Sequence, residues 1–175
     1  QPSWRDPADT ITIRRGRNPM KKILGLALMA VVLGVASIAG AADRYTKQKV
    51  VYHVNYYGAK QQEGALRNIQ NHINAVGAEN LDLKVVMHGN GVSLVMEPEY
   101  LSDTKMKEAN ATAEMQAKIA GLKQQGVEFN ICANTLKGRQ VPMDALYDTT
   151  DADIVPSGVA ELAHLQSQGY TYIKP

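Results

Sequence analysis

The sequence predicts a single α/β domain over residues 43–175, a three-layer sandwich around a parallel, five-stranded sheet. Short β-branched and aromatic runs alternate along this region with segments whose apolar residues recur at helical spacing. Successive runs are always separated by enough residues for a helical crossover and never by a two-residue turn, which argues against antiparallel hairpins. Because such crossovers share one hand, helices should cover both faces of the sheet in a flavodoxin-like arrangement.

The first elements are a strand, a helix and a second strand. Residues 50–54 are β-branched and aromatic and run toward Gly58, as a strand entering a loop does. Apolar residues spaced by three and four over 66–76 predict an amphipathic helix that stops at Gly77. The second strand is expected at 83–87, where an apolar run meets a glycine-rich loop.

The middle of the domain contains the longest expected helix. Residues 92–96 fit either a short helix or a strand, because so short an apolar run has no distinguishing period. Residues 105–125 combine good helix formers with one apolar face, and Gly126 ends the pattern. The alternation over 127–132 predicts a third strand, and a short helix at 133–138 follows it.

The C-terminal elements repeat this alternation. Residues 142–146 fit one helical turn with proline near its first position. A fourth strand is expected at 152–155, after which Ser157 can cap a helix over 158–168. The fifth strand is expected at 170–173.

Residues 20–42 have the order of a cleavable secretion signal. A basic start precedes the apolar run 23–38 and a small-residue stretch, with cleavage expected near Ala41 or Ala42. The alternative is a membrane anchor, which needs roughly 20 apolar residues, more than this run offers. Residues 1–19 show no helix or strand period and are expected to be a disordered upstream extension. We therefore expect a periplasmic or secreted domain without membrane contact after cleavage.

Charge and cysteine content exclude several partners. Residues 1–42 carry six basic and two acidic residues, so the net charge of +2 for the chain becomes −2 for residues 43–175. A nearly neutral domain with scattered lysines has no basic patch of the kind that binds nucleic acid or an anionic membrane. Cys132 is the only cysteine, so no disulfide can form within the chain.

Open parallel sheets bind ligands beyond the carboxyl ends of their strands. The sequence places four loops there, at 56–58, 88–91, 132–134 and 156–158. The pattern does not give the strand order, so not all four need be neighbours. The candidate binding residues in these loops are His88, Gly89, Asn90, Gly91, Ala133, Asn134, Ser157 and Gly158.

Cys132 is the candidate nucleophile. It lies where an expected strand gives way to a helix, and unpaired N–H groups there favour a thiolate over a thiol. The alternative is an inert, buried thiol that packs as a small hydrophobe. An unpaired cysteine in an oxidising compartment is protected, reactive or bridged to another chain.

The four histidines differ in the roles expected for them. His88, flanked by glycines that indicate close backbone approach, could act as a base or orient a bound group, or could simply bond backbone in a turn. His53, inside the first expected strand, is expected to be a packed or interstrand residue, and His72 and His164 to be solvated on helices. No Cys-x-x-Cys or His-x-x-x-His spacing occurs, and the dinucleotide and phosphate-loop motifs are incomplete, so neither a metal nor a cofactor is expected.

Four motifs carry a resemblance to a known family. They are His88-Gly89-x-Gly91, Phe-Asn-Ile-Cys-Ala-Asn-Thr-Leu at 129–136, Val-Pro-Ser-Gly-Val-x-Glu-Leu at 155–162, and Gln-x-x-Gly-Tyr-x-Tyr-Ile-Lys-Pro at 166–175. With them the chain resembles, from about residue 48 onward, the DsrE/DsrF-like family of sulfur-relay proteins. The resemblance implies a flavodoxin-like domain that forms trimers or hexamers, uses no prosthetic group, and carries sulfur as a persulfide on Cys132.

The leading hypothesis is a sulfur carrier or sulfurtransferase-like protein. The Cys132 thiolate would take a sulfane sulfur from a donor and pass it to an acceptor thiol, with His88 or Asn134 assisting. The sequence identifies neither donor nor acceptor, which could be proteins or small thiols. The best-understood family members are cytosolic and work beside dedicated subunits, whereas this chain has an expected signal. The alternative is a non-catalytic small-ligand-binding or assembly protein of the same fold, with Cys132 merely packed.

Overall fold

The computed structural model describes residues 44–175. The expected upstream extension at 1–19 and the expected signal at 20–42 lie outside these residues. Within 44–175 no helix is both long enough and apolar enough to cross a membrane.

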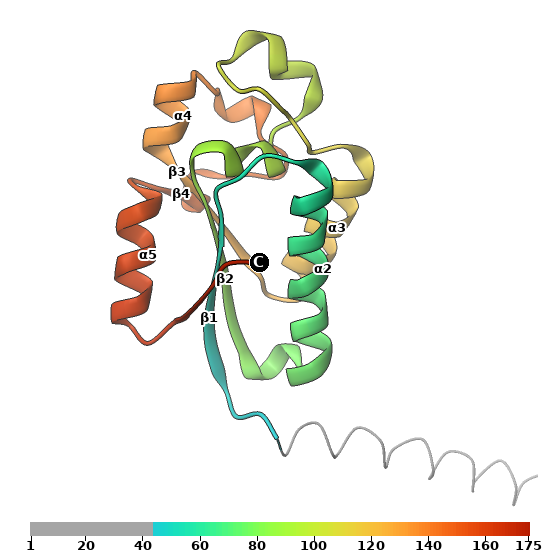
Figure 1. The fold of residues 1–175 in the computed structure, drawn as a ribbon, viewed down its shortest axis with the longest axis vertical. Helices are drawn as coiled ribbons and strands as arrows, with labels where there is room; N and C mark the ends of the chain where they lie inside the picture. The colour runs from blue at the N-terminus through green and yellow to red at the C-terminus, as the bar shows by residue number, and fades with distance from the viewer. Residues whose placement is uncertain (1–43) are drawn as a thin grey trace, which may run out of the picture. The chain divides into compact units, whose positions relative to one another are not determined.

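A five-stranded, wholly parallel sheet forms the centre of the fold (Figure 1). Its order is β4-β3-β2-β1-β5, so the first three strands lie side by side in chain order. This arrangement confirms the predicted α/β class. The strands are β1 (Gln48–Val54), β2 (Leu81–Met87), β3 (Glu128–Cys132), β4 (Ile154–Val155) and β5 (Thr171–Ile173).

Helices cover both faces of this sheet. In Figure 1, α2 and α3 lie on one side of the strands and α5 on the other. The α2/α3 side holds the larger apolar core, in which Val50, Val85 and Phe129 point away from α5. On the α5 side only Val51 and Val86 of the strands pack with apolar residues of α5 and the segment after it. The helices are α2 (Ala59–Val76), α3 (Ala113–Gln124), α4 (Ala133–Arg139) and α5 (Gly158–Ser167).

The predicted helix over 105–125 is wrong in its first part, and α2 rather than α3 is the longest helix. The N–H groups of Asn110 and Ala111 donate to the carbonyls of Ser93 and Met96, 2.7 and 2.9 Å away. These long-range bonds occupy groups that a helix would need, so local propensity is overridden and the helix begins only at Ala113. For the segment 92–96, which fitted either a short helix or a strand, the structure shows the helical alternative over its first residues, because Gly89–Leu94 forms a 3-10 helix.

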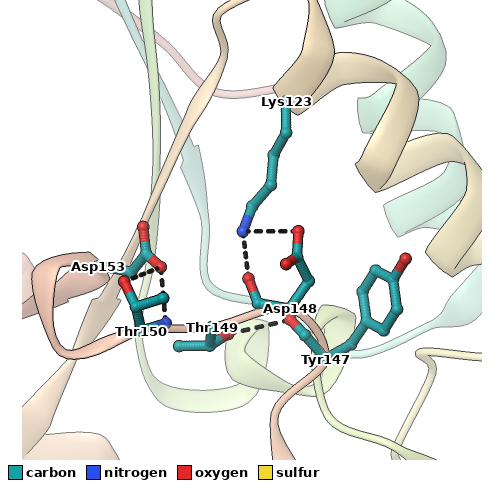
Figure 2. A network of polar contacts seen from close by, with 6 residues as sticks. All are labelled: Lys123, Tyr147, Asp148, Thr149, Thr150 and Asp153. Carbon is teal, nitrogen blue, oxygen red and sulfur yellow. Dashed lines mark hydrogen bonds and ion pairs between the residues drawn. The ribbon is translucent and has the colours of Figure 1, made fainter.

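The strand expected at 152–155 is shorter than predicted. Asp151–Asp153 forms a 3-10 turn in which the hydroxyl of Thr150 and the carboxylate of Asp153 make a capping box. Figure 2 shows this turn beside Lys123, which reaches from the end of α3 to the carbonyl and carboxylate of Asp148. The loop is therefore held at both ends before it enters β4, where Val155 pairs with Cys132.

Candidate functional site

The carboxyl ends of β2 and β3 bring His88 and Cys132 together. Met87 of β2 pairs with Ile131 of β3. The residues that follow them, His88 and Cys132, therefore lie side by side on the same face of the sheet. This is the face on which α5 packs, because Val86, two residues before His88, belongs to the α5 core. Two of the four predicted loops are therefore neighbours, and the start of α5 supplies a third.

Cys132 ends β3 and precedes the first residue of α4. The residue as a whole is buried, at 5% exposed. Burial, the strongest influence, raises the pKa of the thiol, but polar groups around the sulfur together outweigh it and lower the pKa below its ordinary value. These groups are the hydroxyl of Thr135 and the N–H groups of Gly158, Thr135 and Asn134. All of these groups are hydrogen-bond donors directed at the sulfur, and such donors stabilise the thiolate more than the thiol.

Thr135 connects the cysteine loop with the histidine loop. Its Oγ1 accepts a hydrogen bond of 2.8 Å from the N–H of Gly89, which leaves the hydroxyl hydrogen available for the sulfur of Cys132. Sequence reasoning did not select Thr135. The available signal was its position, one turn into the helix that follows the cysteine, where a hydroxyl can reach back to the preceding strand end.

Gly158 is the third side of the site. A Cβ placed on it would lie 2.8 Å from Cβ of His88 and 3.3 Å from Cβ of Cys132. Such distances leave no room for a larger residue. The glycine therefore lets the start of α5 close against both side chains, and its N–H points at the sulfur.

A chain of three polar side chains runs from His88 to the surface. Nε2 of His88 lies 2.7 Å from Nε2 of His53, and Nδ1 of His53 lies 2.7 Å from the hydroxyl of Tyr172. Burial, then His88 and Lys174, lower the pKa of His53 to about 4. Burial and Lys174 also lower the pKa of His88. Both imidazoles are therefore neutral near pH 7, and one must donate to the other.

His53 was expected to be a packed or interstrand residue without a role in the site, and Tyr172 was not selected at all. His53 is buried, at 7% exposed, yet it is hydrogen-bonded at both ring nitrogens. The missed signal was an inward-facing polar residue in an otherwise apolar strand, two residues after Val51 and on the same face.

The other predicted residues surround the site without pointing at the sulfur. Gly91 packs against the backbone of β1, where an added Cβ would lie 2.0 Å from the carbonyl oxygen of Val54. The side chain of Asn90 accepts from Arg139 at 3.4 Å, and that of Ser157 accepts from the N–H of Ala160 at 3.4 Å.

Ala133 begins α4 and, having only a methyl side chain, can offer polar contact through its backbone alone. The loop at 56–58 bonds elsewhere, since the N–H of Gly58 donates to Glu108 at 2.7 Å. Across the described part of the chain, no three or more His, Cys, Asp or Glu side chains gather where they could hold a metal ion.

The fold and the site define a class: a three-layer α/β domain with a wholly parallel sheet and one cysteine at the carboxyl edge of that sheet. The profile of the DsrE/DsrF-like family matches residues 48–175. The chain therefore belongs to the DsrE/DsrF-like family, which is generally linked to sulfur relay. Among curated proteins, none matches this chain.

Solved structures show the same fold. The chain is similar to a protein of unknown function, MTH1491 from Methanobacterium thermoautotrophicum, with 24% identity and a TM-score of 0.59 over 73% of this chain and 99% of that chain. It is also similar to the ychN protein from E. coli, with 18% identity and a TM-score of 0.50 over 75% of this chain and 100% of that chain. At these identities the likeness concerns the fold alone.

Proposed function

We propose that this protein is a sulfur carrier in which Cys132 accepts a sulfane sulfur and holds it as a persulfide. One observation carries the proposal: polar groups from two separate elements, α4 and the start of α5, converge on the sulfur and lower the pKa of its thiol. A depressed pKa increases the thiolate fraction near neutral pH, and the thiolate is the nucleophile.

The chemical step is a displacement at sulfur. The Cys132 thiolate attacks the outer sulfur of a donor R–S–SH, a new S–S bond forms at Sγ, and the old S–S bond breaks with its electron pair going to R–S⁻. The product is a Cys132 persulfide and a released thiolate, so no external oxidant or reductant is needed. A second displacement by an acceptor thiolate at the outer sulfur would restore Cys132.

Intact-mass measurement of residues 43–175 tests the proposal. Treatment with a low-molecular-weight persulfide, polysulfide or thiosulfate should add one sulfur atom, and a reducing agent should remove it. Cys132→Ser is the matched control, because it replaces only the sulfur and should gain nothing. An unmodified wild-type thiol after every donor would contradict the proposal.

The 5% exposure of Cys132 favours a second candidate, a non-catalytic ligand-binding or assembly protein in which the thiol is packed. Alkylation kinetics separate the two. A carrier should react with iodoacetamide in the folded state with a rate that follows the depressed pKa, whereas a packed thiol should react only at the rate of unfolding.

We also propose export and self-assembly for this protein. Export is supported by the order of basic, apolar and small residues over 20–42, and assembly by the family resemblance. Cell fractionation with mass analysis of the mature N-terminus tests the first, and should find the chain starting after Ala41 or Ala42. Light scattering after gel filtration tests the second, with a trimer or hexamer expected and a monomer contradicting it.

A further inference from the structure

Groups from two parts of the chain enclose the sulfur of Cys132. Asn134 and Thr135 follow the cysteine closely at the start of α4, so they cannot retreat from it, whereas Gly158 closes the site from α5. In a displacement at sulfur the attacking, moving and departing atoms lie nearly in line. A donor therefore needs an open path of roughly 4 Å from Sγ, two S–S bond lengths. Because Cys132 is buried, Gly158 has to move before such a path exists.

The first turn of α5 is only weakly held to the sheet. Gly158 is its one buried residue, and the next buried residue along the helix is Leu162. Between them, Val159 is 65% exposed. The bond from the N–H of Ala160 to the capping hydroxyl of Ser157 spans 3.4 Å, longer than a good N–H···O bond. No buried apolar side chain therefore fixes this turn, so it can open at low free energy while the rest of the helix stays packed.

A buried polar atom beneath α5 makes the closed position less stable. Asn130 pairs with Val86, which belongs to the α5 core, so its side chain faces α5. The helix runs back along the parallel strands, and its turn from Gly158 to Leu162 spans the two residues by which Asn130 precedes Cys132. Among the described residues, the buried Oδ1 of Asn130 has no hydrogen-bond partner. Burying an acceptor without a donor is unfavourable, and withdrawal of the turn would let water bond this oxygen.

We propose that the first turn of α5, residues 157–161, is a movable cover that withdraws from Cys132 to admit each sulfur donor and acceptor, an inference that rests on the function proposed above. Withdrawal takes the N–H of Gly158 away from the sulfur and leaves those of Asn134 and Thr135 in place. The closed form thus holds the thiolate, and the open form exposes it. The position of the cover regulates how often Cys132 can exchange sulfur.

Two variants shift the cover in opposite directions. The rate of Cys132 alkylation by iodoacetamide is measured by intact mass, at a pH above the pKa of the thiol in every protein compared. In Gly158→Ala the added Cβ would lie 2.8 Å from Cβ of His88, so the turn cannot close, and we expect alkylation to be about tenfold faster. Asn130→Leu replaces the unpaired oxygen by an apolar side chain of similar size, which favours the closed form, and should slow alkylation by about tenfold.

The pH profile separates the cover from a simple loss of packing. Because Gly158→Ala withdraws an N–H from the sulfur, its alkylation profile should move to higher pH even as its limiting rate increases. Gly126→Ala is the matched control. It strains the backbone at a φ of 89, with no atom within 4 Å, at the opposite end of β3 from Cys132. It should therefore lower stability but alkylate at the wild-type rate with an unshifted profile.

Hydrogen exchange of wild type tests the cover without any variant. The amide of Glu161, which donates to the carbonyl of Ser157 at 2.9 Å, should exchange through local opening, far faster than the amides of β2. If it is protected as strongly as β2, or if both variants alkylate at the wild-type rate while wild type still gains sulfur, the cover is overturned and the carrier function survives. If the variants behave as expected but no donor adds sulfur to wild type, the carrier function fails, and with it the role of the cover in sulfur exchange.

Discussion

Acid should destabilise this protein through His53, and the size of the effect can be worked out. The pKa of His53 falls from an ordinary 6.5 to about 4 in the folded chain, chiefly through burial. Well above pH 6.5 the imidazole is neutral in both states and adds no pH dependence. As the pH falls below 6.5, His53 binds a proton in the unfolded chain but not in the folded one. The free energy of unfolding therefore decreases until the pH reaches the pKa of His53 in the folded chain, about 4. Between about pH 7.5 and about pH 4.5 this loss is about 2.5 kcal/mol.

The measurement is urea unfolding of wild type and His53→Gln at those two pH values. Glutamine is neutral at both and can still bond Tyr172 or His88, so the variant should lack this part of the pH dependence. His72 and His88, whose pKa values are also lowered, remain in both proteins and largely cancel. We expect the variant to lose about 2.5 kcal/mol less than wild type on acidification. Equal losses would show that His53 is readily protonated in the folded state and would refute the reasoning.

Three further predictions concern the site and its support. Gly91→Ala should lower the unfolding free energy by about 3 kcal/mol, because the added Cβ would collide with the carbonyl of Val54. Gly89→Ala should lower it by only about 1 kcal/mol, because Gly89 has a φ of 55 but open space around it. Calorimetry that gave the reverse ranking would contradict this reasoning. Thr135→Val should raise the pKa of Cys132, seen as a shift of the alkylation profile to higher pH, and Thr135→Ser should restore it. Tyr170→Phe should cost about 1 kcal/mol in urea unfolding by removing the 2.6 Å bond to Asp82, and no change would show that the bond contributes nothing.

Local sequence patterns were sufficient to predict the strands of the parallel sheet and to select Cys132 as a candidate site residue. Strands such as β1 and β2 are apolar runs bounded by turn residues, and those signals lie within a few residues of each other. Cys132 and His88 were selected because Cys132 ends a strand and His88 follows one, and a parallel sheet gathers such positions at one edge.

The rest depends on contacts between distant segments. The hydroxyl of Tyr172 bonds a histidine 119 residues earlier in the chain, and this becomes visible only once β5 is known to pair with β1. The same limit explains the false helical start at residue 105. Helix-forming side chains predicted it, while bonds from Asn110 and its neighbours to a segment near Ser93 prevented it.

The brevity of the outer strands restricts how copies of this chain can associate. β4 has two residues and β5 has three, so either flank of the sheet offers only a few unsatisfied backbone groups to an incoming strand. Extending the sheet from one subunit into the next would thus gain few main-chain bonds. A ring of subunits would have to form through contacts between side chains on helices and loops, which can be altered without touching the strands.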